Sequence, residues 1–231
     1  MKKNYKHLFF DLDHTLWDTD KNSAESLSEL YHELELSNHG LPSFDKFLEC
    51  YRSHNERLWG LYSDNKIGRD AVRVNRFRYT LEDFSIHNYN LANVLSDEFV
   101  KRTPYKPHLI ADTIHVLDNI AGKYQMSIIT NGFKESQAIK MQHSGIGNYF
   151  EHLFISEEVG FNKPDVRIFE HALEKAGIKS EEALMIGDTY DTDITGARAA
   201  NIDQVYFKET PSEDQEATYV ISRLSHLLEI I

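Results

Sequence analysis

The sequence has a single cysteine, and none of its apolar runs is long enough to cross a membrane. Cys50 has no partner for an intramolecular disulfide, and the lack of a C-x-x-C pair excludes thiol-redox chemistry and cysteine zinc ribbons. A transmembrane helix needs roughly 18 or more apolar residues. The apolar stretch after the first lysines ends at Asp11, too early for a secretory signal. We therefore predict a cytoplasmic protein with no membrane partner.

Basic residues are also scarce relative to acidic ones. The 25 lysines and arginines against 37 aspartates and glutamates give a net charge of −12 with histidine neutral. Binding to a nucleic-acid polymer requires a basic face, so no such partner is expected, and an anionic membrane surface is disfavoured for the same reason. The 12 histidines form no H-x-H or H-E-x-x-H pattern, which argues against a zinc site.

The sequence does contain a succession of short apolar runs that end in polar residues, the pattern of buried parallel strands. The three strongest runs lie at residues 7–12, 125–129 and 183–186, and weaker ones at 152–155, 204–207 and 219–221. Helical periodicity occupies the intervals 110–120 and 166–176. Strands that alternate with helices predict an α/β fold with a Rossmann-like parallel sheet.

Residues 17–103 have a different character, because no strand pattern appears among them. Apolar side chains recur at helical spacing in three stretches, which begin near Ala24, Phe44 and Leu91. We predict an all-helical domain over residues 17–103, inserted into an α/β core made of residues 1–16 and 104–231. A length of 231 residues and an apolar content of 41% suit a core domain with one insertion.

Carboxylate, hydroxyl and amide side chains follow three of the predicted strands. They are Asp11, Asp13 and Thr15 after the first strand, Thr130 and Asn131 after the second, and Asp188 and Asp193 after the third. Ligands of an open parallel sheet bind beyond the carboxyl ends of its strands. We therefore expect these side chains, distant in sequence, to meet in one crevice.

Asp11 and Asp13 would repel each other unless a positive charge lay between or beside them. Several oxygen ligands suit a hard cation, and Mg²⁺ fits best because it keeps places for water and phosphate. Asp11, directly after the strand, can act as a nucleophile, and Asp13 can transfer a proton to a leaving group. The alternative for this segment is an acid-rich turn, which its position at a strand end disfavours.

Two further segments are ambiguous when taken alone. Lys163 precedes Pro164, which keeps it out of helical geometry, so that it can neutralise a carboxylate or phosphoryl oxygens; otherwise it would be an ordinary surface lysine. Thr130 and Asn131 can bind phosphate together with the N-terminus of the next helix, or can form a plain strand-to-helix turn. Asp191 is interpreted as a solvated residue or one at a helix N-terminus rather than as a ligand.

Together, the segments DLDHT, IITNG, NKPD and GDTYDTD resemble the four ordered motifs of the haloacid dehalogenase-like (HAD) hydrolase superfamily. The helical insertion after the first motif resembles the C1 cap of that superfamily. The segments TNGF, SEEVG, HNERLW and VNRFRY further resemble the 5′-nucleotidase branch, which acts on nucleoside monophosphates. Dehalogenating members lack the second acid that Asp13 supplies here.

The resemblance implies a Mg²⁺-dependent phosphatase in which Asp11 is the nucleophile, forms an aspartyl-phosphate and also binds the metal. Asp13 would be the general acid and base and would bind the metal through its backbone carbonyl. Asp188 would be a metal ligand. Asp193 would orient metal-bound water or Lys163 without binding the metal itself.

The resemblance also implies that Thr130, with help from Asn131, holds the phosphoryl group and that Lys163 stabilises its charge. In the helical domain, Asn55, Trp59 and Arg76 are candidates for contact with the substrate. Core packing is the favoured role of Trp59. The other arginines of residues 69–78 are interpreted as a solvated face paired with acids, and Arg76 is the best exception.

The predicted function is hydrolysis of a small phosphate ester, with nucleoside 5′-monophosphates as the favoured substrates. The alternatives are a phosphatase of sugar phosphates or other small phosphometabolites, a phosphomutase, and a binding protein without catalysis. No oligomeric state is predicted.

Overall fold

The computed structural model describes residues 3–208, 210 and 215–231. The chain divides into two compact units, one of Met1–Thr19 with Pro107–Ile231 and one of Asp20–Lys106, which we call the core unit and the helical unit. Each boundary lies three residues beyond the position expected from the sequence. The physical reason is Trp17, which is 1% exposed in the hydrophobic core of the core unit and forms a bridge with Leu109.

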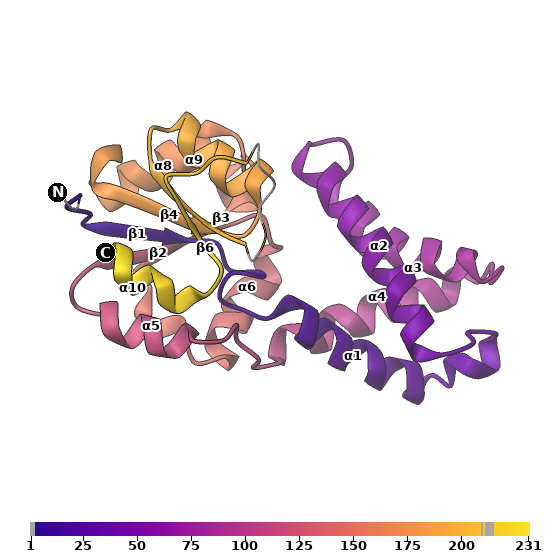
Figure 1. The fold of residues 1–231 in the computed structure, drawn as a ribbon. Coiled ribbons are helices and arrows are strands. Elements are labelled where there is room, and N and C mark those ends of the chain that lie inside the picture. The colour runs from indigo at the N-terminus through magenta and orange to yellow at the C-terminus, as the bar shows by residue number, and fades with distance from the viewer. Residues whose placement is uncertain (1–2, 209, 211–214) are drawn as a thin grey trace. The chain divides into compact units, whose positions relative to one another are not determined.

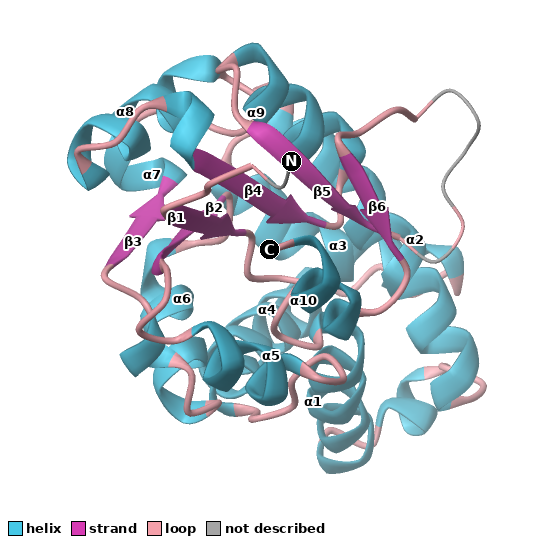
Figure 2. Ribbon diagram, turned by 60° about the vertical axis from the view of Figure 1, so that its left-hand side comes forward, coloured by secondary structure: helices cyan, strands magenta, loops and turns pink. Residues whose placement is uncertain are grey.

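The core unit contains a sheet of six parallel strands in the order β3-β2-β1-β4-β5-β6 (Figures 1 and 2). The strands are β1 (His7–Phe10), β2 (Gln125–Thr130), β3 (His152–Ile155), β4 (Ala183–Gly187), β5 (Asp203–Phe207) and β6 (Tyr219–Ile221). Every apolar run singled out in the sequence overlaps one of them, and no strand end lies more than two residues from the end of its run. The predicted α/β fold with a parallel sheet is confirmed.

Helices cover both faces of this sheet, as Figure 2 shows. Helices α5 (Thr113–Ile120), α6 (Lys134–His143) and α10 (Leu227–Ile230) share one hydrophobic cluster with Leu8 and Phe10 of β1. Helices α8 (Val166–Ala176) and α9 (Thr195–Ala199) pack with Phe9 on the other face, and the short α7 (Ser156–Val159) follows β3. Because alternate residues of β1 serve opposite faces, all four of them are buried.

The order of the strands places β1 at the point where the connections reverse direction. Strands β1, β2 and β3 follow one another toward one edge, and β4 then returns to the other side of β1. Phe10 pairs with Ile186, and the backbone N–H of Asp11 donates to the carbonyl of Ile186 at 2.8 Å. Asp11 and Asp188 therefore leave neighbouring strands at the switch point, where doubly wound sheets bind their ligands.

The helical unit consists of α1 (Thr19–Glu33), α2 (Phe44–Ser63), α3 (Arg69–Asp83) and α4 (Tyr89–Arg102), and the first of these begins at the unit boundary. Ser43 and Asn88 cap α2 and α4 by accepting hydrogen bonds from the backbone N–H groups of Lys46 and Leu91. Its core includes Leu30, Phe47, Phe77 and Leu95. The structure describes every residue of this unit, and none lies in a strand. Within the described part of the chain, no helix combines the length and apolar character of a membrane span.

Candidate active site

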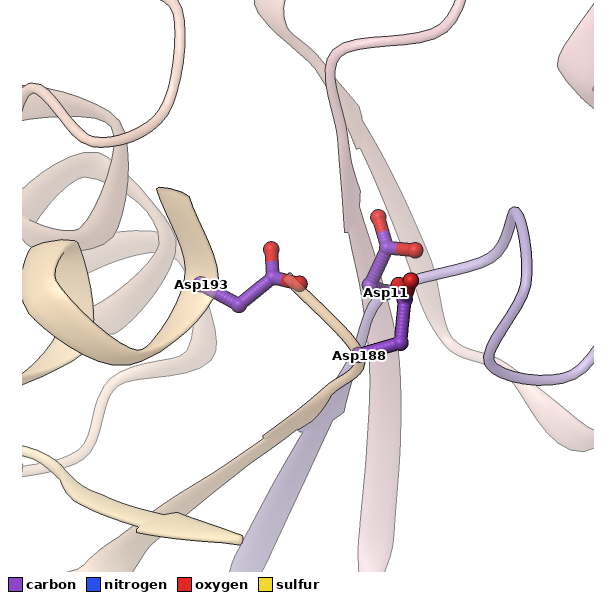
Figure 3. A group of neighbouring side chains, drawn as sticks. All are labelled: Asp11, Asp188 and Asp193. Carbon is purple, nitrogen blue, oxygen red and sulfur yellow. The ribbon is translucent and has the colours of Figure 1, made fainter. Parts of the chain in front are cut away.

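Three aspartates meet at the carboxyl ends of β1 and β4. Asp11 follows β1, Asp188 follows β4, and Asp193 comes from a π-helical turn, Tyr190–Ile194, that β4 leads into. One carboxylate oxygen of each lies within 4.8 Å of the others, and Figure 3 shows the three side chains turned toward one another. As expected from the sequence, side chains more than 170 positions apart thus lie close together.

Lys163 lies inside this group of carboxylates. Its Nζ is 2.6 Å from Oδ1 of Asp11, 2.6 Å from Oδ1 of Asp193 and 2.8 Å from the carbonyl oxygen of Ile129. The side chain is only 2% exposed, and each of its three ammonium protons has an oxygen partner. Lys163 is therefore a buried charge with three fixed partners and not a surface lysine.

The balance of charge leaves the site short of a cation. Burial raises the pKa of Asp11 to about 8 against the lowering effect of Lys163, with Asp193 and Asp188 adding to the rise. Burial, followed by the charge of Asp193, raises the pKa of Asp188 to about 7. Burial alone would lower the pKa of Lys163, but attraction to Asp11 and Asp193 raises it. Three carboxylates thus face one ammonium, and a divalent cation would hold all of them ionised.

The environment of Asp193 suits an orienting role. Its Oδ1 accepts from Lys163 at 2.6 Å and its Oδ2 from the backbone N–H of Thr189 at 3.1 Å. A Cβ added to Gly187 would lie 2.3 Å from Oδ2 of Asp193, so the glycine of the GD pair makes room for this carboxylate. Asp188 accepts only longer hydrogen bonds, from Thr15 Oγ1 at 3.3 Å and from Thr189 Oγ1 at 3.4 Å. Asp11 and Asp188 therefore fit the ligand set of a hard cation better.

The carboxylate of Asp13 turns toward α6. Its Oδ1 accepts from Lys140 Nζ at 2.6 Å and from Thr19 Oγ1 at 3.0 Å, and its Oδ2 accepts from Gln137 Nε2 at 2.8 Å. Burial would raise the pKa of Asp13, but the charge of Lys140 and the hydrogen bonds from Gln137 and Lys140 lower it overall. None of these three donors was predicted from the sequence to take part in the site. The spacing of Gln137 and Lys140, one helical turn apart after the TNG segment, was the available signal.

The second motif contributes Thr130, through its hydroxyl, and Asn131, whose amide contacts the backbone of Lys163. Thr130 Oγ1 accepts from the backbone N–H of Gly132 at 2.9 Å and from Gln137 Nε2 at 2.8 Å, so its own proton can point to a bound oxygen. Asn131 exchanges two hydrogen bonds with the backbone of Lys163, at 2.8 and 2.9 Å. The side chain predicted to help bind phosphate thus holds the lysine loop in place.

In the helical unit, two of the three predicted contact residues lie together. Arg76 donates to Oδ1 of Asn55 at 3.1 Å and is 5% exposed. The rings of Tyr51, Phe77 and Phe99 surround its guanidinium at 5.8, 5.4 and 4.7 Å from their centroids. No carboxylate among the described residues pairs with it, and burial lowers its pKa.

The other arginines of α3 are paired with acids, unlike Arg76. Their guanidinium nitrogens lie close to carboxylate oxygens: Arg69 at 3.8 Å from Asp70, Arg73 at 3.6 Å from Asp97, and Arg78 at 3.6 Å from Glu82. Pairing with acids is what the sequence predicted for these arginines. Trp59 packs edge-on against Tyr62, with ring centroids 5.5 Å apart. Arg76 is therefore the buried cation of this unit that has no ionic partner in the described chain.

Known proteins share both the sequence pattern and the fold. The family model described as haloacid dehalogenase-like hydrolase matches residues 8–207. The pyrimidine 5′-nucleotidase YjjG of Escherichia coli is 28% identical over 97% of this chain and 96% of its own. A glyceraldehyde 3-phosphate phosphatase of Pyrococcus furiosus is 29% identical over 99% and 94%. The crystal structure of the HAD hydrolase YfnB of Bacillus subtilis, bound to magnesium, matches with a TM-score of 0.89, 26% identity and 99% coverage of both chains. Asp11, Lys163 and Asp188 thus lie at the sheet edge of a chain that belongs to the haloacid dehalogenase-like hydrolases and is a phosphoric monoester hydrolase of that family.

Proposed function

We propose that this protein hydrolyses nucleoside 5′-monophosphates in a Mg²⁺-dependent reaction through an aspartyl-phosphate on Asp11. The observation that carries the proposal is the contact between Lys163 and Asp11 at 2.6 Å, in a buried site that two further carboxylates share. Lys163 holds Oδ1 of Asp11 and leaves Oδ2 to attack phosphorus. The same ammonium offsets the charge of the phosphoryl oxygens.

The reaction would run in two displacements. In the first, Asp11 Oδ2 forms a bond to phosphorus, the bond from phosphorus to the ester oxygen breaks, and Asp13, protonated in the enzyme–substrate complex, gives that oxygen a proton. In the second, a water molecule gives a proton to Asp13 and attacks the aspartyl-phosphate, which releases inorganic phosphate and restores Asp11. The hydroxyl of Thr130 would donate to a phosphoryl oxygen throughout.

The oxygen-only donor set supports a hard divalent cation. Asp11 and Asp188 directly follow the adjacent strands β1 and β4 and would bind it through their carboxylates, with the backbone carbonyl of Asp13 as a further ligand. The structure of YfnB bound to magnesium supports this choice of metal. Bound Mg²⁺ would neutralise the carboxylates and the phosphoryl group, and such electrostatic stabilisation, together with positioning, supplies most of catalysis in phosphoryl transfer.

The helical unit is proposed to select the substrate, because the core motifs address only a phosphoryl group and a metal. The nucleotide preference is supported by YjjG, whose name identifies it as a pyrimidine 5′-nucleotidase and which matches over nearly the whole chain. Asn55 and Arg76 support it further, since their amide and guanidinium N–H groups are suited to the carbonyl oxygens of a nucleobase. The Pyrococcus furiosus relative makes a sugar phosphate the second candidate.

Removal of the metal should abolish turnover. In EDTA the carboxylates of Asp11 and Asp188 would lose the cation that keeps them ionised, and the phosphoryl group would lose its counter-charge. Hydrolysis of p-nitrophenyl phosphate should return with Mg²⁺, and return poorly with Ca²⁺, which prefers longer bonds and more ligands. Full activity in EDTA would contradict the proposed metal dependence.

Replacement of Asp193 by Asn should slow the reaction without unfolding the protein. Lys163 would lose one of its two anionic partners, and groups that orient an active-site residue in this way typically contribute about 10–100-fold. Asp191→Asn is the matched control, because Asp191 is exposed in the same turn and its replacement removes the same charge. Equal kcat values for the two variants with p-nitrophenyl phosphate would show that Asp193 does not orient Lys163.

A substrate screen should rank nucleoside 5′-monophosphates above sugar phosphates. Arg76→Gln should then lower kcat/KM for the preferred nucleotide by about 10-fold or more while it changes p-nitrophenyl phosphate little, because the small ester makes few contacts with the helical unit. Arg73→Gln, on the same helix and already paired with Asp97, is the control. Better turnover of sugar phosphates than of every nucleotide would overturn the nucleotidase assignment and leave the phosphatase assignment intact.

A further inference from the structure

Two side chains of α6 that lie outside the four motifs contact the carboxylate of Asp13. We propose that Gln137 and Lys140 are positioning residues that hold Asp13 beside the hydroxyl of Thr130, and that proton transfer to the leaving group depends on them. The inference rests on the proposed function, since it assigns these residues a part in that reaction.

Lys140 is held in place from two sides. Its Nζ lies 2.6 Å from Oδ1 of Asp13 and 4.4 Å from the centroid of the Trp17 ring, a cation–π contact. Trp17 is 1% exposed in the core, and the side chain of Lys140 is only 12% exposed. An exposed lysine samples many rotamers, but the two contacts and the low exposure of Lys140 restrict the positions open to it. The position of the Asp13 carboxylate is therefore tied to the core of the sheet.

Gln137 links Asp13 to the site that would hold the phosphoryl group. Its Nε2 donates at 2.8 Å to Oδ2 of Asp13 and at 2.8 Å to Oγ1 of Thr130, so one NH₂ group serves both. The reversed amide would point its oxygen at the carboxylate, which fixes the orientation seen here. Gly132 makes room for this amide, because an added Cβ there would lie 1.6 Å from Nε2.

The consequence is geometric. Proton transfer requires Asp13 within hydrogen-bond reach of the leaving oxygen, and a displacement of about 1 Å can cost on the order of 100-fold in rate. The two α6 side chains and Thr19 engage both carboxylate oxygens, and the two α6 donors lie on one face of one helix. Both donors also lower the pKa of Asp13, so their loss would favour its protonated form. The displacement of the carboxylate is the larger effect in this account, and loss of either α6 donor should therefore impair the step that uses the proton more than the attack by Asp11.

Two substrates of nearly the same shape separate this role from a purely structural one. The p-nitrophenolate ion leaves without a proton, whereas the more basic phenolate of phenyl phosphate benefits from one. The ratio of their kcat/KM values reports the steps up to release of the phenol, before hydrolysis of the aspartyl-phosphate. Asp13→Asn gives the largest change in this ratio that loss of proton transfer can produce.

For Lys140→Met we expect kcat/KM to fall about 10-fold or more with phenyl phosphate and less than about 3-fold with p-nitrophenyl phosphate. Lys140→Arg should restore most of the loss, since a guanidinium also donates to a carboxylate. Gln137→Glu keeps the shape of the side chain but removes both N–H donors. It should lower kcat/KM for both esters, because Thr130 is affected too, and the loss should be larger for phenyl phosphate. Gln142→Glu, exposed on the same helix, is the matched control and should change neither.

The thermal unfolding midpoint of each variant shows whether it is folded, and Lys140→Met at a partly exposed position keeps the test open if Gln137→Glu does not fold. An active wild type with equal losses on the two esters, or no loss for Lys140→Met, would contradict the positioning role and leave the proposed function standing. A wild type that hydrolyses neither ester in Mg²⁺ would contradict the proposed function, and the positioning role would fall with it.

Discussion

The buried ammonium of Lys163 is the interaction on which the rest of the site depends. It touches Asp11, Asp193 and the carbonyl of Ile129, and it is almost wholly removed from water. Buried ion pairs contribute little net stability, because desolvation offsets much of their attraction. A cluster with more carboxylates than cations is poorly explained as a stabilising feature. It is well explained as a place where a metal and a phosphoryl group complete the balance of charge.

Much of the surrounding sequence serves to keep this lysine in place. Asn131 clamps its backbone, Thr189 fixes the second oxygen of Asp193, and Gly187 leaves the space that the Asp193 carboxylate needs. These residues come from the carboxyl ends of different strands, which the parallel sheet brings together on one side of the core unit. The topology therefore supplies the site, and its chemistry comes from the short polar segments after β1, β2 and β4 together with Lys163 in the loop between α7 and α8.

The fold and the central residues could be predicted from the sequence because their signals are local. A buried parallel strand is apolar along its whole length, and a polar residue at its end marks the binding edge, which located Asp11, Thr130 and Asp188. Contacts that depend on side-chain direction could not be predicted in this way. The sequence does not show that Gln137 and Lys140 turn toward Asp13, nor that the amide of Asn131 faces the Lys163 loop. The expected boundary was short for the same reason, since Trp17 resembles the apolar residues of the helical block but packs in the sheet core.

The central claim is that phosphate passes through Asp11. Acid quenching during turnover with Mg²⁺ and a phosphomonoester, followed by peptide mass spectrometry, tests it most directly. The account predicts a hydroxylamine-sensitive phosphate on the peptide that contains Asp11, absent from Asp11→Asn, which should be inactive but folded. Phosphate on another residue, or turnover by Asp11→Asn at the wild-type rate, would contradict the account.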